Sequence, residues 1–118
     1  MNEITHPERT TLNDTEMFDD IVNGILSVMG DDVLKIILYG SVARGDNTWE
    51  SDVDIAVITK KHYNWNAFED LWEYDLKYDT LFQIVPIEEK RFNELKPVKL
   101  FYRNIEKDGV VLWPKKED

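Results

Sequence analysis

The hydrophobic and polar positions of this chain divide it into alternating helical and extended segments. From about position 14, apolar residues recur at helical spacing, and the pattern stops at Gly30, a residue type that commonly follows the end of a helix. An apolar, β-branched run over Val33–Tyr39 predicts a buried strand. Residues 51–59 predict a second strand whose two faces differ. One face carries Val53, Ile55 and Val57, and the other carries Asp52, Asp54, Ala56 and Ile58.

The second half of the chain continues this alternation. An amphipathic helix with an acidic outer face is predicted by the spacing of Trp65, Phe68, Leu71, Trp72 and Leu76, and we expect its aromatic residues to pack in the core. Residues 79–87 predict a third strand, which Pro86 limits to an edge or an end of the sheet. The remaining pattern predicts a helical turn over 88–95, a helix from Pro97 to position 108 that stops at Gly109, and a short strand over Val110–Trp113.

The connection between the first two strands determines how they pair. It runs from Tyr39 to Ser51, which is short for a parallel crossover, because such a crossover usually takes a dozen or more residues. The two strands are therefore expected to be antiparallel neighbours. In that arrangement Gly40 and Ser41 share one end of the sheet with Asp52 and Asp54.

Length and charge narrow the class of protein. The 118 residues fit a single domain over 14–113, with a loose arm at 1–13 and a polar tail at 114–118. The formal net charge of -10 disfavours nucleic acid as a partner, and favours a basic protein or a cation-bound nucleotide. The absence of cysteine excludes disulfides and thiolate metal sites. No apolar run approaches the roughly 20 residues of a membrane span, and the first residues are too polar for a signal peptide, so a cytoplasmic location is expected.

The turn after the first strand has the residues of an anion-binding corner. Gly40 has no side chain, so a phosphate can approach its backbone closely. Ser41 offers a hydroxyl and suits the start of a one-turn helix, where free N–H groups attract anions. Arg44 adds positive charge nearby. An ordinary strand-to-helix turn is the alternative interpretation of the same dipeptide.

Asp52 and Asp54 are two residues apart on a strand, so both carboxylates leave the same face. At about 4 Å two like charges repel by roughly 4 kcal/mol at an effective dielectric constant of 20. A divalent cation would relieve that repulsion, and hard oxygen ligands favour Mg²⁺ or Mn²⁺. The alternative is an edge strand that carries two solvated acids.

A third carboxylate would complete a two-metal site. Asp79, at the head of the third predicted strand, is the candidate, and a turn residue between helix and strand is its alternative role. Gln83 lies on the same predicted face and is a weaker candidate. Asp46 and Glu50 belong to the connection, where we expect them to be solvated or paired with Arg44.

These residues together resemble the signature of the minimal nucleotidyltransferases of the polymerase-β superfamily. The resemblance covers residues 34–58 densely: Gly40-Ser41, then Ala43-Arg44-Gly45, then Ser51-Asp52-Val53-Asp54. It implies an α/β (α+β) fold with a small mixed β-sheet and helices packed against it. It also implies that Gly40 and Ser41, with Arg44, hold nucleotide phosphates, that Asp52 and Asp54 bind Mg²⁺ or Mn²⁺, and that Asp79 is the third acid.

The implied reaction is transfer of a nucleoside monophosphate, AMP from ATP, to an acceptor hydroxyl by a two-metal mechanism. Small stand-alone members of the family that resemble this chain are often antitoxins that bind a helical HEPN-domain toxin and modify it with AMP, so a protein acceptor is expected. Two alternatives stay open. One is a catalytically weak nucleotide-binding antitoxin that acts by contact alone, and the other is an aminoglycoside-type enzyme that modifies a small molecule.

Overall fold

The computed structural model describes residues 13–48 and 50–115, so most of the predicted arm and tail lie outside the described residues. Helices and strands follow one another in the order α1 (Asn13–Met29), a 3-10 turn η1 (Gly30–Asp32), β1 (Val33–Tyr39), α2 (Gly40–Arg44), β2 (Val53–Thr59), a second 3-10 turn η2 (Glu69–Leu71), α3 (Trp72–Tyr78), β3 (Phe82–Glu88), α4 (Glu89–Leu95), α5 (Leu100–Asp108) and β4 (Val110–Trp113). No helix within these ranges is both long and apolar enough to cross a bilayer.

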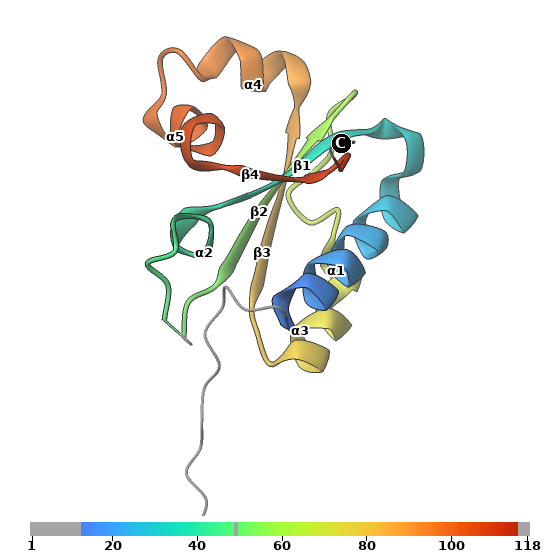
Figure 1. Cartoon of the computed structure of the whole chain (residues 1–118). Coiled ribbons are helices and arrows are strands. Elements are labelled where there is room, and N and C mark those ends of the chain that lie inside the picture. The colour runs from blue at the N-terminus through green and yellow to red at the C-terminus, as the bar shows by residue number, and fades with distance from the viewer. Residues whose placement is uncertain (1–12, 49, 116–118) are drawn as a thin grey trace, which may run out of the picture.

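The four strands form one mixed sheet in the order β3-β2-β1-β4 (Figure 1). The pair β1–β2 is antiparallel, as the short connection predicted, β2–β3 is parallel, and β1–β4 is antiparallel. Strand β3 lies at an edge of the sheet, which confirms the position predicted from Pro86. The mixed sheet with helices on it confirms the predicted fold class.

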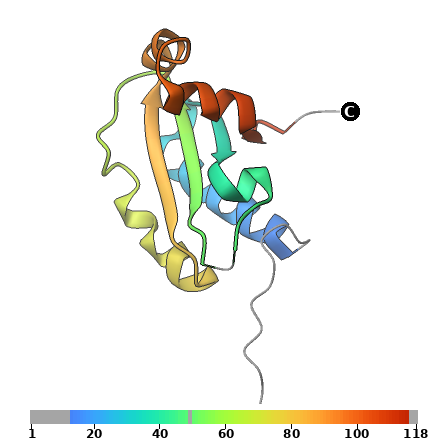
Figure 2. The same cartoon turned by 90° about the vertical axis from the view of Figure 1, so that its left-hand side faces the viewer.

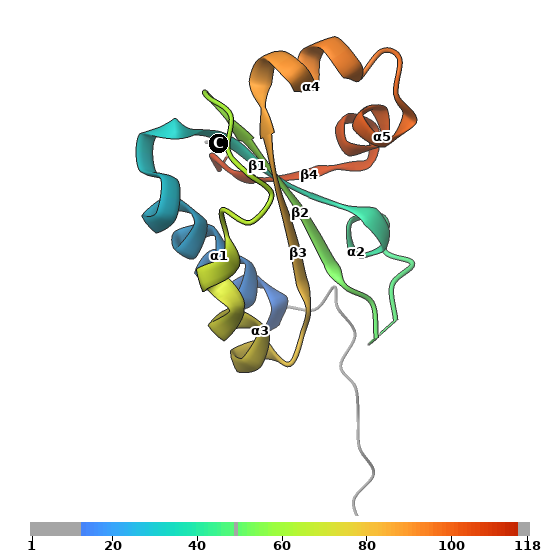
Figure 3. The same cartoon turned by 180° about the vertical axis from the view of Figure 1, so that it is seen from behind.

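Helices cover both faces of the sheet, and the alternation of β2 assigns its residues to the two sides. Helices α1 and α3 lie on one face, and α2, α4 and α5 lie on the other (Figures 1 and 3). The larger core, which α1 contributes to, contains Val53, Ile55 and Val57. The smaller core, under α4 and α5, contains Ala56 and Ile58. The predicted division of β2 into two faces is therefore confirmed, and Asp52 and Asp54 project on the side of α2 and α5.

The segment between β2 and β3 differs most from its prediction. Regular helical structure begins only at Glu69, with η2, and continues as α3. Phe68 is buried as predicted, but Trp65 is 83% exposed and Trp72 is 59% exposed, so their assignment to the core was wrong. Leu76, one turn after Trp72, is also exposed. The large side chains of this stretch thus divide between the core and the surface.

Two element boundaries also shift. The third strand begins at Phe82 and not at Asp79, because Asp79 takes a left-handed conformation (φ 49°) that ends α3. The last helix begins at Leu100, so Pro97 precedes it instead of occupying its first turn. Gly109 follows the helix, as predicted.

Candidate active site

The turn after β1 lies against the carboxylate of Asp54 in β2. A Cβ built on Gly40 would lie 2.3 Å from Oδ2 of Asp54 and 3.2 Å from its Cγ. Gly40 also has φ +79°, which side chains other than glycine rarely allow. The antiparallel register produces the contact, because Tyr39, the last residue of β1, pairs with Asp54. The structure thus brings the turn that was predicted to bind phosphate against the pair of aspartates that was predicted to bind a cation.

The turn itself is a single helical turn that starts at Gly40 and is closed by a second glycine. The backbone N–H of Gly45 donates to the carbonyl of Ser41 at 3.0 Å, and Gly45 has φ +81°. The N–H of Asp46 donates to the same carbonyl at 3.1 Å. Ser41 is half-buried at the start of this turn, and Arg44 lies at its end.

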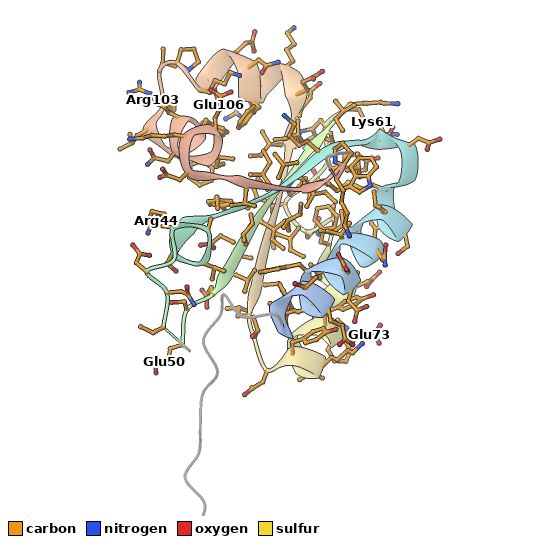
Figure 4. The ribbon with its side chains drawn as sticks, in the orientation of Figure 1. Arg44, Glu50, Lys61, Glu73, Arg103 and Glu106 are labelled. Carbon is orange, nitrogen blue, oxygen red and sulfur yellow. The ribbon has the colours of Figure 1, made fainter. Side chains whose placement is uncertain are left out.

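Arg44 forms an exposed ion pair that a bound anion could replace. Its Nε lies 3.2 Å from Oδ2 of Asp46, and both side chains are about half exposed or more, at 47% and 62%. A pair of this kind contributes little stability because water screens it. Figure 4 shows Arg44 on the outer side of α2 and Glu50 at the tip of the connection to β2. Asp46 therefore pairs with Arg44 as expected, while Glu50 is exposed.

Asp52, just before β2, and Asp54, within it, have different surroundings. Burial raises the pKa of Asp54, repulsion from Asp52 raises it further, and the positive charge of Arg44 lowers it. Asp52 lies one residue outside the strand, and its Oδ2 accepts a hydrogen bond from Nε2 of Gln83 at 3.3 Å. The uncompensated charge at Asp54 is what a bound cation would stabilise.

Strand β3 presents Gln83 beside the aspartates, and Asp79 lies elsewhere. Asp54 and Gln83 are direct neighbours in the β2–β3 register, whereas Asp79 ends α3 three residues before β3 begins. Within the described parts of the chain, no group of three or more Asp, Glu or His side chains is placed to hold a metal ion. The structure therefore does not bring Asp79 together with Asp52 and Asp54. The residue in reach of the pair is Gln83, which sequence reasoning ranked second.

Tyr39 is a neighbour of the site that sequence reasoning did not identify. Burial, with the negative charge of Asp54, raises the pKa of its phenol to about 12. Its ring packs edge-to-face on Phe101 of α5, with 5.8 Å between ring centroids. The signal that could have found it is the antiparallel register, which puts residues paired across two strands on the same face.

The comparisons with known proteins agree with this geometry. Residues 23–118 match the family described as polymerase beta, nucleotidyltransferase. A Methanocaldococcus jannaschii protein, provisionally named protein adenylyltransferase MJ0604, is 32% identical over 102 residues, covering 86% of this chain and 100% of that relative.

Solved structures with the same fold include chains of toxin–antitoxin complexes. One, from the crystal structure of a mutant toxin–antitoxin MntA–HpeT, has a TM-score of 0.63 at 18% identity, covering 84% of this chain and 74% of that one. Another, from tri-AMPylated Shewanella oneidensis HEPN toxin in complex with MNT antitoxin, has a TM-score of 0.54 at 16% identity, covering 85% and 71%. At these identities the likeness shows a shared fold. The family match over residues 23–118 and the full-length relative show that this chain belongs to the polymerase beta nucleotidyltransferase family.

Proposed function

We propose that this nucleotidyltransferase transfers AMP from ATP to a hydroxyl group on a partner protein of the HEPN toxin type. The observation that carries the proposal is the contact between Gly40 and Asp54, since it sets an anion-binding turn against a pair of carboxylates. The provisional name of the M. jannaschii relative supports a protein acceptor. The neighbour in which a HEPN toxin is AMPylated beside an MNT antitoxin supports the choice of acceptor.

The residues present fit a divalent cation such as Mg²⁺ or Mn²⁺. Asp52 and Asp54 offer hard oxygen ligands on one face, and burial with mutual repulsion raises the pKa of Asp54, which is the condition that a cation relieves. When bound, the cation would neutralise charge on the phosphates. With two carboxylates and the amide of Gln83, the side chains suit one tightly held cation better than the two that three carboxylates would hold.

In the proposed mechanism this chain mainly positions the reactants. The backbone at Gly40 and Ser41, with the guanidinium of Arg44 once it leaves Asp46, binds the phosphates of ATP. The acceptor hydroxyl oxygen forms a bond to the α-phosphorus, the bond from that phosphorus to the bridging oxygen breaks, pyrophosphate leaves, and the hydroxyl proton passes to water. The rate advantage comes from orientation and from charge neutralisation.

One observation favours a second function. Because Gln83 occupies the position nearest the carboxylate pair on β3, the site has no third acid there to accept the hydroxyl proton. A chain of this kind could bind ATP and its partner without fast transfer. It would then neutralise a toxin by contact alone.

A transfer assay separates the two functions. The purified chain is incubated with ATP labelled at the α-phosphorus, Mg²⁺ and a HEPN-type toxin from the same genome, and label on the toxin is measured. AMP transfer predicts label on the toxin that disappears in Asp54→Ala and persists in the matched control Asp31→Ala. Asp31 is an exposed acid in η1, at the opposite end of β1 from Gly40. An unlabelled toxin that still binds the Asp54→Ala chain without ATP would support neutralisation by contact and contradict the transfer proposal.

A further inference from the structure

An exposed aromatic surface lies beside the edge strand β3, on the stretch whose burial was predicted wrongly. Trp65 is 83% exposed, Trp72 is 59% exposed and Leu76 is 72% exposed. Trp72 and Leu76 are one turn apart on α3 and therefore lie on the same side of the helix. Large apolar side chains gathered on a surface mark a site of interaction, because each keeps apolar area in water that a partner could cover.

The two tryptophans border a groove between the η2–α3 segment and the sheet. The groove has a volume of about 210 Å³. Trp65 and Trp72 line it together with Phe82 and Ile84 of β3 and with the buried side chains of Phe68 and Leu71. Figure 2 shows the same arrangement of segments, with the yellow α3 region running alongside the orange strand β3. The groove can therefore hold apolar side chains of a bound segment.

Both of the described charged residues that line this groove are negative. Glu69 and Asp75 line it, and Asp70 and Glu73 are exposed on the same two helical turns. Of the described residues that line the groove, none is a lysine, arginine or histidine. Lys77, the next cation along α3, points its ammonium group to Asp20 of α1, 2.7 Å away. An indole face beside carboxylates is a favourable environment for an arginine or lysine side chain.

The same charges select among possible occupants. Nucleic acid and anionic membrane surfaces carry the wrong sign for a groove that, among the described residues, is lined by two acids and no basic residue. A second copy of this chain is disfavoured too, since its net charge is -10 and a two-fold contact would face these acids with themselves. The remaining occupant is a segment of another protein that carries arginine or lysine next to apolar side chains.

The groove and the candidate active site lie on opposite faces of the sheet and share the edge strand β3. Gln83 lines the groove, and its Nε2 donates to Oδ2 of Asp52 at 3.3 Å. We propose that the Trp65–Trp72 groove docks a basic, apolar segment of the acceptor protein, and that the acceptor reaches the Asp52–Asp54 pair around the edge strand β3. The docked protein's role as acceptor rests on the proposed function, whereas the docking itself does not.

The test uses the full chain and two synthetic amphipathic peptides of equal length. One peptide combines leucine with arginine, and the other has glutamate at every arginine position. We expect the arginine peptide to bind and to shift tryptophan emission to shorter wavelength, because exposed indoles leave water. In calorimetry, Trp65→Ser/Trp72→Ser should weaken binding about tenfold or more. The matched control, Val98→Ser/Leu100→Ser, removes apolar side chains that are 68% and 66% exposed and should bind like the wild type.

A second variant keeps the aromatic side chains and tests the charges alone. Glu69→Gln/Glu73→Gln should weaken binding of the arginine peptide and reduce its dependence on salt. Equal binding of the arginine and glutamate peptides, or wild-type affinity in both groove variants, would overturn the proposal. The Asp54→Ala chain should bind the arginine peptide as the wild type does. If that holds while the wild-type chain labels no protein, the proposed function fails and the docking surface stands.

Discussion

The carboxylate of Asp54 lies against the backbone of Gly40 at the point where β1 turns into α2. Oδ2 is so near that a Cβ at position 40 would meet it at 2.3 Å. Only a glycine at this position allows the carboxylate pair of β2 to sit directly beside the turn. The relationship therefore connects two local motifs of the sequence into one site.

Replacement of this glycine should damage both fold and site. We expect Gly40→Ala to lower the free energy of unfolding by about 2 kcal/mol or more, because the new methyl group is strained at φ +79° and collides with Asp54. Gly45→Ala is the matched control, since Gly45 has φ +81° but a Cβ added there would meet nothing within 4 Å, so this variant has only the backbone strain. Urea unfolding measures both. Equal losses in the two variants would show that the Asp54 contact is unimportant.

Neutralisation of Asp54 should separate stability from activity. Since burial and Asp52 raise the pKa of Asp54 above 3.8, ionisation is less favourable in the folded chain than in the unfolded chain. Wild-type stability therefore falls as pH rises from 3.8 through the folded-state pKa, while Asp54→Asn avoids that loss.

We expect Asp54→Asn to be at least as stable as the wild type at neutral pH and to lose label transfer. The gain in stability should disappear below pH 3.8. Thermal melts across this pH range measure it, with the exposed Asp46→Asn as control. A variant that melts well below the wild type at neutral pH would contradict the proposed desolvation of Asp54.

The position of Gln83 predicts how the cation site responds to an added acid. Gln83→Glu places a third carboxylate beside Asp52 and Asp54, so we expect Mn²⁺ to bind about tenfold or more tightly, measured by calorimetry without nucleotide. Asp79→Asn should leave Mn²⁺ affinity unchanged, because Asp79 ends α3 outside β3. If Asp79→Asn instead weakened Mn²⁺ binding as strongly as Asp52→Asn, Asp79 would be the third ligand, as the sequence predicted.

The aromatic residues before β3 should differ sharply in their effect on stability. Phe68 is 6% exposed, so Phe68→Ala should lower the free energy of unfolding by about 3–5 kcal/mol. Trp65→Ser and Trp72→Ser should each change it by no more than about 0.5 kcal/mol, since both side chains lie mainly in water. Chemical denaturation of the three variants measures these changes in the free energy of unfolding. A large loss of stability in Trp65→Ser would show that Trp65 packs in the core after all.

Most of the central sheet could be predicted because its sequence pattern is local. The bounds of β1, the antiparallel pairing of β1 with β2 and the common face of Asp52 and Asp54 all follow from alternation and from one short connection. The same locality explains why the contact between the turn and the carboxylate pair could be anticipated. Both parts lie within residues 40–54, where few arrangements of the chain are possible.

The wrong predictions arise where the hydrophobic pattern alone does not determine the structure. An apolar period predicts that one side of a segment avoids water, but it does not say whether the core or another protein covers that side, and this is why Trp65 and Trp72 were misplaced. Asp79 was assigned to a strand because the left-handed conformation that ends α3 is not visible in the residues around it. With β3 beginning at Phe82, Asp79 lies outside the strand, and Gln83 is the residue of β3 that contacts Asp52.

The edge position of β3 has a consequence for how this molecule avoids self-assembly. An unpaired strand edge is a template onto which other chains can add, and fibrils grow by repeated addition of this kind. Pro86 lies in the middle of β3 and has no N–H to offer an incoming strand. The molecule can thus keep this edge uncovered next to its groove, available to side chains of a partner, without continuous backbone pairing along the strand.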